Sequence, residues 1–233
     1  MTTASNFLFH KDGAITTITF NRPERRNCLN EEVILEFENL LQKVRDDRET
    51  RALIVTGTGN AFCSGADMSQ VKTLPDAAQR RALSKQIGKR LPRLIGRAFD
   101  VLAHLDAVTI GAINGYAVGG GWSLALGFDF CLAVEAAEFW VPEVDMEVPY
   151  RGAPAKVLAA RLGPWIAKEA ILLCRHYKAA ELLALGVINR VVEPEELMPE
   201  ALKLARAIAA KPADAIANSK RDINAVFFGQ RLF

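Results

Sequence analysis

The chain has 233 residues, half of them hydrophobic, and its 29 basic and 27 acidic side chains give a net charge of +2. This length can bury one large core, and the near-neutral charge argues against nucleic acid or an acidic membrane as the main partner. The sequence shows no apolar run of membrane-spanning length and no apolar leader. We therefore expect a soluble, cytoplasmic protein and leave small-molecule chemistry open.

The first sixty residues predict a hairpin, a helix and a buried strand. Asp12 and Gly13 lie between two alternating apolar stretches, which is typical of a hairpin turn. Asn30 precedes apolar residues at helical spacing and is expected to cap the helix that follows. The apolar, β-branched run at 52–56 then predicts a buried strand.

The remainder of the chain predicts alternating strands and helices, followed by a mainly helical part. Residues 69–104 are expected to be helical but broken at Pro75 and Pro92. Extended pieces are expected at 108–110, 128–134, 139–142 and 187–192, and helices at 153–162, 165–174, 179–185, 194–210 and 213–226. This alternation indicates an α/β layered fold with parallel strand pairing.

Two glycine-containing turns follow strand-like runs and could place backbone N–H groups around one ligand. The first turn covers residues 63–68; the second contains Gly119, Gly120 and Gly121 and leads into a helix expected near Trp122. Glycine lets amides point at a ligand, and a helix start adds partial positive charge. Such turns can hold an anion or a developing oxyanion, although a lone glycine triplet more often serves only a tight turn.

Four motifs occur in order along the chain: NRPERRNCLN at 21–30, AFCSGADM at 61–68, AINGYAVGGG at 112–121 and FWVPEV at 139–144. Together they resemble the enoyl-CoA hydratase/isomerase (crotonase) superfamily. The resemblance implies a spiral of ββα units with a C-terminal helical part, assembled as a homotrimer or homohexamer. We expect a crotonase-like core at 1–192 and a C-terminal helical segment at 193–233 that is short for the family.

The resemblance also implies roles for three residues in the chemistry of a thioester enolate. The N–H groups of Ala66 and Gly120 would surround the enolate oxygen, and Glu143 would be the acid/base. Apolar neighbours indicate a partly buried Glu143 carboxylate with a raised pKa. Taken alone, Glu143 would be interpreted as an exposed residue at a strand end, and Asp145 and Glu147 are second-choice carboxylates.

The sequence departs from the family pattern at two places. Typical hydratases carry a second glutamate where this chain has Ser123, and their two carboxylates together activate water. One carboxylate suffices for isomerisation, and hydroxycinnamoyl-CoA hydratase-lyases also pair a serine here with a glutamate at the Glu143 position. Tyr150 and Arg151 replace a usual proline and glycine, so we expect them to reshape the acyl pocket, with a surface role for Arg151 as the alternative.

Other candidate residues have weaker support from the sequence. Ser64 and Arg25 are carried over from the resemblance as contacts to coenzyme A, and Arg26 is an equally good candidate. Large apolar residues could line the acyl pocket or simply belong to the core: Met68, Trp122, Phe130 and Trp140. The four cysteines show no metal or disulfide spacing, so we expect them to be reduced.

These observations together predict an acyl-CoA-processing enzyme of the hydratase/isomerase type that acts on an acyl-CoA thioester. No metal or redox cofactor is expected, since coenzyme A is carried as part of the substrate. Within this class, the alternative is a hydratase-lyase or another enolate reaction. The rival from another class is a catalytically silent CoA-binding or scaffold homologue, because a fold can persist without its activity.

Overall fold

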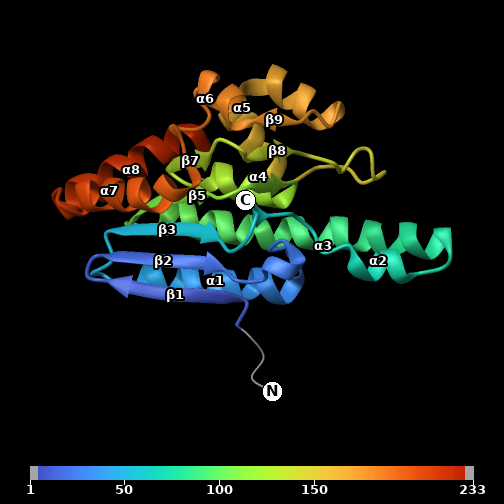
Figure 1. The fold of residues 1–233 in the computed structure, drawn as a ribbon, viewed down its shortest axis with the longest axis horizontal. Coiled ribbons are helices and arrows are strands. Elements are labelled where there is room, and N and C mark those ends of the chain that lie inside the picture. The colour runs from blue at the N-terminus through green and yellow to red at the C-terminus, as the bar shows by residue number, and fades with distance from the viewer. Residues whose placement is uncertain (1–4, 229–233) are drawn as a thin grey trace.

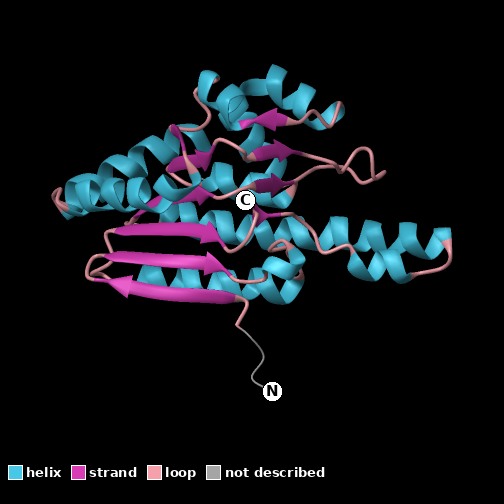
Figure 2. Ribbon diagram, viewed as in Figure 1, coloured by secondary structure: helices cyan, strands magenta, loops and turns pink. Residues whose placement is uncertain are grey.

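A computed structural model describes residues 5–228, and Figures 1 and 2 show strands packed among helices. The larger sheet has the strand order β1-β2-β3-β5-β7-β10, and the smaller sheet has the order β4-β6-β8-β9. The larger sheet contains β1 (Phe7–Asp12), β2 (Ile15–Phe20), β3 (Ala52–Gly57), β5 (Val108–Ile113), β7 (Phe130–Val134) and β10 (Arg190–Val192). The smaller sheet contains β4 (Ala61–Cys63), β6 (Tyr116–Val118), β8 (Glu138–Trp140) and β9 (Tyr177–Lys178).

Pairs of strands followed by helices repeat along the chain. The helices that close these units are α1 (Glu31–Asp46), α2 (Ser69–Thr73) with α3 (Ala77–His104), α4 (Gly120–Gly127) and α5 (Ala153–Leu172). From the second unit on, the first strand joins the larger sheet and the second strand joins the smaller one. Strands β2, β3, β5 and β7 pair in parallel. The predicted α/β spiral of ββα units is therefore confirmed.

Local sequence signals predicted several element boundaries correctly. Gly13 has a φ of +55° in the turn between β1 and β2, which pair antiparallel as predicted. The Asn30 side chain caps α1 by accepting a hydrogen bond from the N–H of Val33 at 2.8 Å. Polar side chains at this position satisfy an N–H group that the helix itself leaves unpaired.

One predicted helix break is wrong. α3 continues through Pro92, because Leu91, Ile95 and other buried side chains on the same helix hold it against the core despite the lost hydrogen bond. The two helices predicted at 153–162 and 165–174 are confirmed: α5 is divided by a kink at Gly163, whose φ of +75° is not helical.

The helices after residue 192 pack on the larger sheet. They are a short 3-10 turn (Pro194–Glu196), α7 (Leu197–Ala209) and α8 (Ala213–Phe228), and α6 (Ala179–Ala184) precedes them. α7 contacts β3 and β5, and its buried side chains belong to the same apolar core as the sheet. In Figure 1, α7 and α8 lie together beside β5 and β7. The division at residue 192 stays a prediction.

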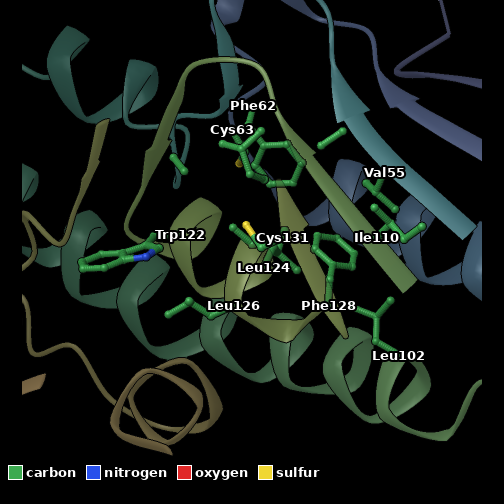
Figure 3. Close-up of a cluster of buried hydrophobic side chains, with 14 of the residues drawn as sticks. Val55, Phe62, Cys63, Leu102, Ile110, Trp122, Leu124, Leu126, Phe128 and Cys131 are labelled. Atoms are coloured by element: carbon green, nitrogen blue, oxygen red, sulfur yellow. The ribbon is translucent and has the colours of Figure 1, made fainter. Parts of the chain in front are cut away.

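The interior between α4, α3 and the sheets is filled by apolar side chains. Figure 3 shows Trp122 and Leu124 from α4 in one cluster with Phe62 of β4, Ile110 of β5 and Phe128, the residue that follows α4. All four cysteines are free and buried, and burial raises the pKa of the Cys63 thiol to about 12. Within residues 5–228, no helix combines the length and the apolar character needed to cross a bilayer.

Candidate active site

Three neighbouring strands of the smaller sheet direct three chain segments toward one cavity. β4 pairs in parallel with β6, and β6 pairs in parallel with β8. Because the carboxyl ends of parallel strands meet at the same edge of a sheet, the segments that follow them start side by side. These segments are the turn at 64–68, the glycine turn at 119–121 and the loop at 141–152.

The first turn is attached by its backbone to the segment that precedes α1. Leu29 donates its N–H to the carbonyl of Gly65 at 2.7 Å, and Asp67 donates its N–H to the carbonyl of Leu29 at 2.8 Å. Ala66 lies between Gly65 and Asp67, and its N–H takes part in neither of these two hydrogen bonds. Gly65 has a φ of +79°, a conformation that residues with a Cβ rarely adopt.

The second turn packs directly on the first. Gly119 has a φ of +51° and donates its N–H to the carbonyl of Trp140 at 2.8 Å. Gly120 is the first residue of α4, so its N–H has no acceptor within the helix. A Cβ on Gly65 would lie 3.6 Å from the nitrogen of Gly120, and one on Gly121 would clash with the carbonyl of Cys63. Any side chain at these glycines would therefore separate the turns.

A cavity of about 680 Å³ opens beside the two turns. Of the predicted site residues, its wall includes Arg25, Ser64, Ala66, Met68, Gly120, Glu143 and Tyr150. An apolar part of the wall comes from α3, through Ile87, Leu91 and Ile95. The motif residues thus meet at a cavity large enough for a small organic group.

Glu143 presents a carboxylate in a poorly hydrated place. Its Oε2 atom is buried and has no hydrogen-bond partner among the described residues. Burial disfavours the charged form and raises the pKa of this carboxyl to about 7. Its Oε1 atom lies so close to Gly119 that a Cβ there would clash with it. The expectation of a partly buried carboxylate with a raised pKa is confirmed.

Two hydroxyl groups lie close to this carboxylate. Ser123 is fully buried, and its Oγ donates to the carbonyl of Gly119 at 3.2 Å. The hydroxyls of Ser123 and Tyr150 are hydrogen-bonded to each other, and the Tyr150 hydroxyl is 3.5 Å from the same carbonyl. Burial, and then the charge of Glu143, raises the pKa of Tyr150 well above its usual range. Tyr150 is therefore a neutral hydroxyl near the carboxylate.

A family model described as enoyl-CoA hydratase/isomerase matches residues 10–231. The chain belongs to the enoyl-CoA hydratase/isomerase family. A short-chain-enoyl-CoA hydratase from Clostridium acetobutylicum is 32% identical, over 94% of this chain and 81% of the relative. A crotonyl-CoA hydratase from Syntrophomonas wolfei is 33% identical over the same shares. The chain is thus similar to enzymes that process acyl-CoA, and it is an enzyme of that type.

Solved structures of the same family share the fold. An enoyl-CoA hydratase subunit from Geobacillus kaustophilus superposes with a TM-score of 0.82 at 30% identity, covering 96% of this chain and 82% of the other. A hydratase/isomerase from Xanthobacter autotrophicus gives a TM-score of 0.84 at 33% identity, covering 98% and 82%. These matches confirm the crotonase-like fold class.

Not every residue predicted for the site of this family member lies on the cavity wall. Trp122 is fully buried beside Phe139 and Tyr177, because its position on α4 faces the core. Trp140 stacks on the ring of His176 at 4.4 Å, since strand alternation directs it away from the cavity. Neither tryptophan lines the cavity, nor does Phe130 or Ser123. Ser123 is connected to the wall through its hydrogen bonds to Tyr150 and to the carbonyl of Gly119.

The apolar wall contains residues that motif reasoning missed. Ile87, Leu91 and Ile95 repeat at helical spacing on α3, a signal that identifies a buried helix face but does not separate core from cavity wall. Arg151 and Val148 also lie on the wall. Contacts between residues far apart in the sequence decide which apolar side chains face the cavity. Helical spacing carries no information about those contacts.

Other carboxylates near the site are engaged elsewhere. Asp67 lies on the wall, and its side chain accepts the N–H of Ser69. Burial acts to raise the pKa of this carboxyl, but hydrogen bonds from Ser69, together with other contacts, outweigh burial, and the pKa is lowered. Glu147 is exposed and pairs with Arg81 at 3.1 Å. Neither Asp145 nor Glu147 lines the cavity. Glu143 is thus the carboxyl on this wall whose pKa is raised toward neutrality.

Proposed function

We propose that the chain binds an enoyl-CoA thioester with its carbonyl oxygen between the N–H groups of Ala66 and Gly120. As the substrate becomes an enolate, negative charge develops on that oxygen, and fixed backbone donors stabilise it. The observation that carries this proposal is the convergence of the turns after β4 and β6, together with Glu143 after β8, on one cavity. A single donor of this kind typically contributes about 3 kcal/mol to the transition state.

Glu143 is proposed as the acid/base that moves protons at the carbon atoms next to the thioester. A general acid/base works best when its pKa is close to the working pH, and burial supports such a value here. Hydration of a 2-enoyl thioester is the first candidate reaction, since similar proteins are named short-chain-enoyl-CoA and crotonyl-CoA hydratases.

Isomerisation of a 3-enoyl to a 2-enoyl thioester is the second candidate. Ser123 takes the place at which the family pattern has a second glutamate, and one carboxyl can carry a proton from one carbon to another. Glu143 is the wall carboxyl with a raised pKa, which fits a mechanism with one acid/base. A hydratase-lyase or another enolate reaction remains the alternative within the class.

The ligand contacts and assembly are proposed from the resemblance. Arg25 and Ser64 would contact coenzyme A, and Met68 would contact the acyl group; all three lie on the cavity wall. We propose no metal or redox cofactor, since backbone donors and one carboxyl suffice for the chemistry. A homotrimer or homohexamer and a cytoplasmic location likewise stay predictions.

A panel of 2-enoyl and 3-enoyl thioesters, followed by enone absorbance, tests this proposal. Loss of absorbance from 2-enoyl substrates indicates hydration, and gain of absorbance from 3-enoyl substrates indicates isomerisation. Glu143→Gln should remove either activity while coenzyme A thioesters still bind. Binding of thioesters without turnover by the wild-type chain would instead support the catalytically silent alternative.

A further inference from the structure

The carbonyl and Cα of Gly119 bring three polar side chains together. Glu143 Oε1 touches this glycine, and the hydroxyls of Ser123 and Tyr150 lie 3.2 and 3.5 Å from its carbonyl oxygen. Glu143 and Tyr150 both lie on the cavity wall, and the carboxylate charge is close enough to raise the pKa of the tyrosine. A carboxylate and a neutral hydroxyl therefore border the same small space.

Both groups have hydrogen-bonding capacity left for a ligand. Glu143 Oε2 is buried without a partner among the described residues, and buried carboxylate oxygens are normally hydrogen-bonded. Tyr150 carries one proton and two lone pairs; the contact with Ser123 uses one of these, and the carbonyl of Gly119, at 3.5 Å, is a long and weak alternative acceptor for the proton. The missing partner is thus an atom that donates to a carboxylate and accepts from a phenol, as a water or alcohol oxygen does.

Ser123 fixes the direction of the tyrosine hydroxyl. Either hydroxyl can be the donor of the bond between them. When Ser123 donates to Tyr150, the tyrosine proton is released toward the cavity. The carbonyl of Gly119 still accepts the backbone N–H of Ser123 at 3.1 Å, so this switch leaves no buried carbonyl without a donor.

We propose that Tyr150 and Glu143 together bind the oxygen attached to, or about to attach to, C3 of the acyl chain, with Ser123 as the positioning residue. This inference rests on the proposed function and specifies its substrate class: 2-enoyl thioesters and their 3-hydroxyacyl products. The serine and tyrosine hydroxyls thereby take over the water-holding task that a second carboxylate performs in the family pattern.

A single titrating group, the Glu143 carboxyl, accounts for every proton that moves in the proposed reaction. Glu143 takes a proton from water as the water oxygen bonds to C3, and the electron pair of the double bond moves to form the thioester enolate. Glu143 then gives that proton to C2, and the thioester carbonyl is restored. Tyr150 donates a hydrogen bond throughout and neither gains nor loses a proton, which agrees with its raised pKa.

Binding of two thioesters that differ only at C3 tests this inference without requiring turnover. Titration calorimetry would compare 3-hydroxybutyryl-CoA with butyryl-CoA for the wild type, Tyr150→Phe and Ser123→Ala. We expect the wild type to prefer the hydroxy compound about tenfold, the size of effect that one or two hydrogen bonds to a buried site confer. Tyr150→Phe should lose most of this preference while binding butyryl-CoA as before, and Ser123→Ala should lose part of it.

Tyr177→Phe is the matched control. It also removes one tyrosine hydroxyl, here bonded to Glu169 at 3.2 Å and away from the cavity wall, and should keep the full preference. In turnover, Tyr150→Phe should lower kcat for hydration about tenfold with little change in KM and leave any isomerisation intact. Both readouts separate a role at C3 from a general effect on folding.

Two outcomes would overturn the inference. One is a wild type that binds both thioesters equally or binds neither. The other is a Tyr150→Phe variant that keeps the preference for the hydroxy compound. A wild type that shows the preference but no turnover would instead contradict the proposed function and leave the C3-oxygen site standing, so the two failures are distinguishable.

Discussion

The cavity is bounded by two regions that are built in different ways. The turns after β4 and β6 contribute backbone N–H groups and are fixed by bonds to neighbouring segments and by glycine contacts. The loop at 141–152 contributes the side chains of Glu143 and Tyr150. Its backbone bonds are mostly internal, such as the N–H of Val148 to the carbonyl of Glu143 at 2.8 Å, and Glu147 has a φ of +58°.

This difference indicates how stability and reaction type are divided in the molecule. The backbone donors cannot move unless the sheet edge moves with them, so substitutions there affect folding and chemistry together. Side chains on the loop can change the proton chemistry without changing the position of the donors. We therefore expect Tyr150 on this loop, with its partner Ser123 on α4, to change the reaction site while the turns keep their geometry.

The largest expected effect comes from the loop. Glu143→Gln removes the proposed acid/base but keeps the shape of the side chain, and we expect turnover to fall about 10²- to 10⁴-fold with the fold intact. Glu147→Gln on the same loop is the matched control, because its side chain is exposed and should change the rate less than twofold. Enone absorbance measures both. Equal rates for the wild type and Glu143→Gln would contradict the assignment.

The next largest effect concerns the anchoring of the sheet. Lys220 of α8 is buried and pairs with Asp129 at 2.7 Å, and Asp129 accepts the N–H of Thr109 at the start of β5. Lys220→Met should lower the free energy of unfolding by about 3 kcal/mol, because a buried charge loses its partner. Urea denaturation measures this.

An exposed ion pair on the same helix supplies the comparison for Lys220. Arg221 pairs with Asp106 at 3.2 Å, and both side chains are mostly exposed. Arg221→Met should therefore cost less than about 1 kcal/mol. If the two variants lose the same stability, the buried pair is not the anchor that the structure indicates.

The third prediction breaks the contact between the turns. Gly65→Ala adds a Cβ at a φ of +79°, 2.7 Å from the carbonyl oxygen of Val118, so the turn must shift away from Gly120. We expect turnover to fall about 10²-fold, the loss typical of one misplaced oxyanion donor. Gly186→Ala is the control, because its φ of +70° is similar but the surrounding space is open. Gly186→Ala should lower stability by roughly 1 kcal/mol and leave turnover per folded molecule unchanged.

A dependence on pH is also expected. The pKa of Glu143 is about 7 in the fold and 4.5 without burial. Between these values the folded chain holds more protons than the unfolded one, so the free energy of unfolding falls as pH rises, by at most about 1.4 kcal/mol per pH unit. The wild type should show this slope more strongly than Glu143→Gln in denaturation between pH 4.5 and 7. Because the base must be ionised, kcat/KM should rise through pH 7.

Local patterns in the sequence predicted much of the fold, because they act over few residues. The cap at Asn30 and the hairpin turn at Gly13 depend only on neighbours and were correct. The break predicted at Pro92 was wrong, since packing of α3 against the core outweighs one missing backbone bond. Helix propensity reflects the local sequence and does not include the stabilisation that comes from tertiary packing.

The site residues that belong to sequence motifs could be predicted. Contacts between residues far apart in the sequence could not. Ala66, Gly120 and Glu143 lie on one cavity, as the order of the motifs implied, although their roles stay predictions. The pairing of Ser123 with Tyr150 joins residues 27 positions apart, and no local signal announces it. Trp122 was expected on the acyl-pocket wall, but the orientation of α4 directs it into the core.

Pro92 makes the part of the cavity wall formed by α3 easier to bend. It lies within α3 and on the wall, and because proline has no N–H, the carbonyl of Gly88 one turn earlier has no helical donor. A helix lacking one backbone bond bends most easily at that place. We therefore expect tolerance of longer acyl groups to decline gradually with chain length, as the helix yields, rather than to stop at a sharp limit.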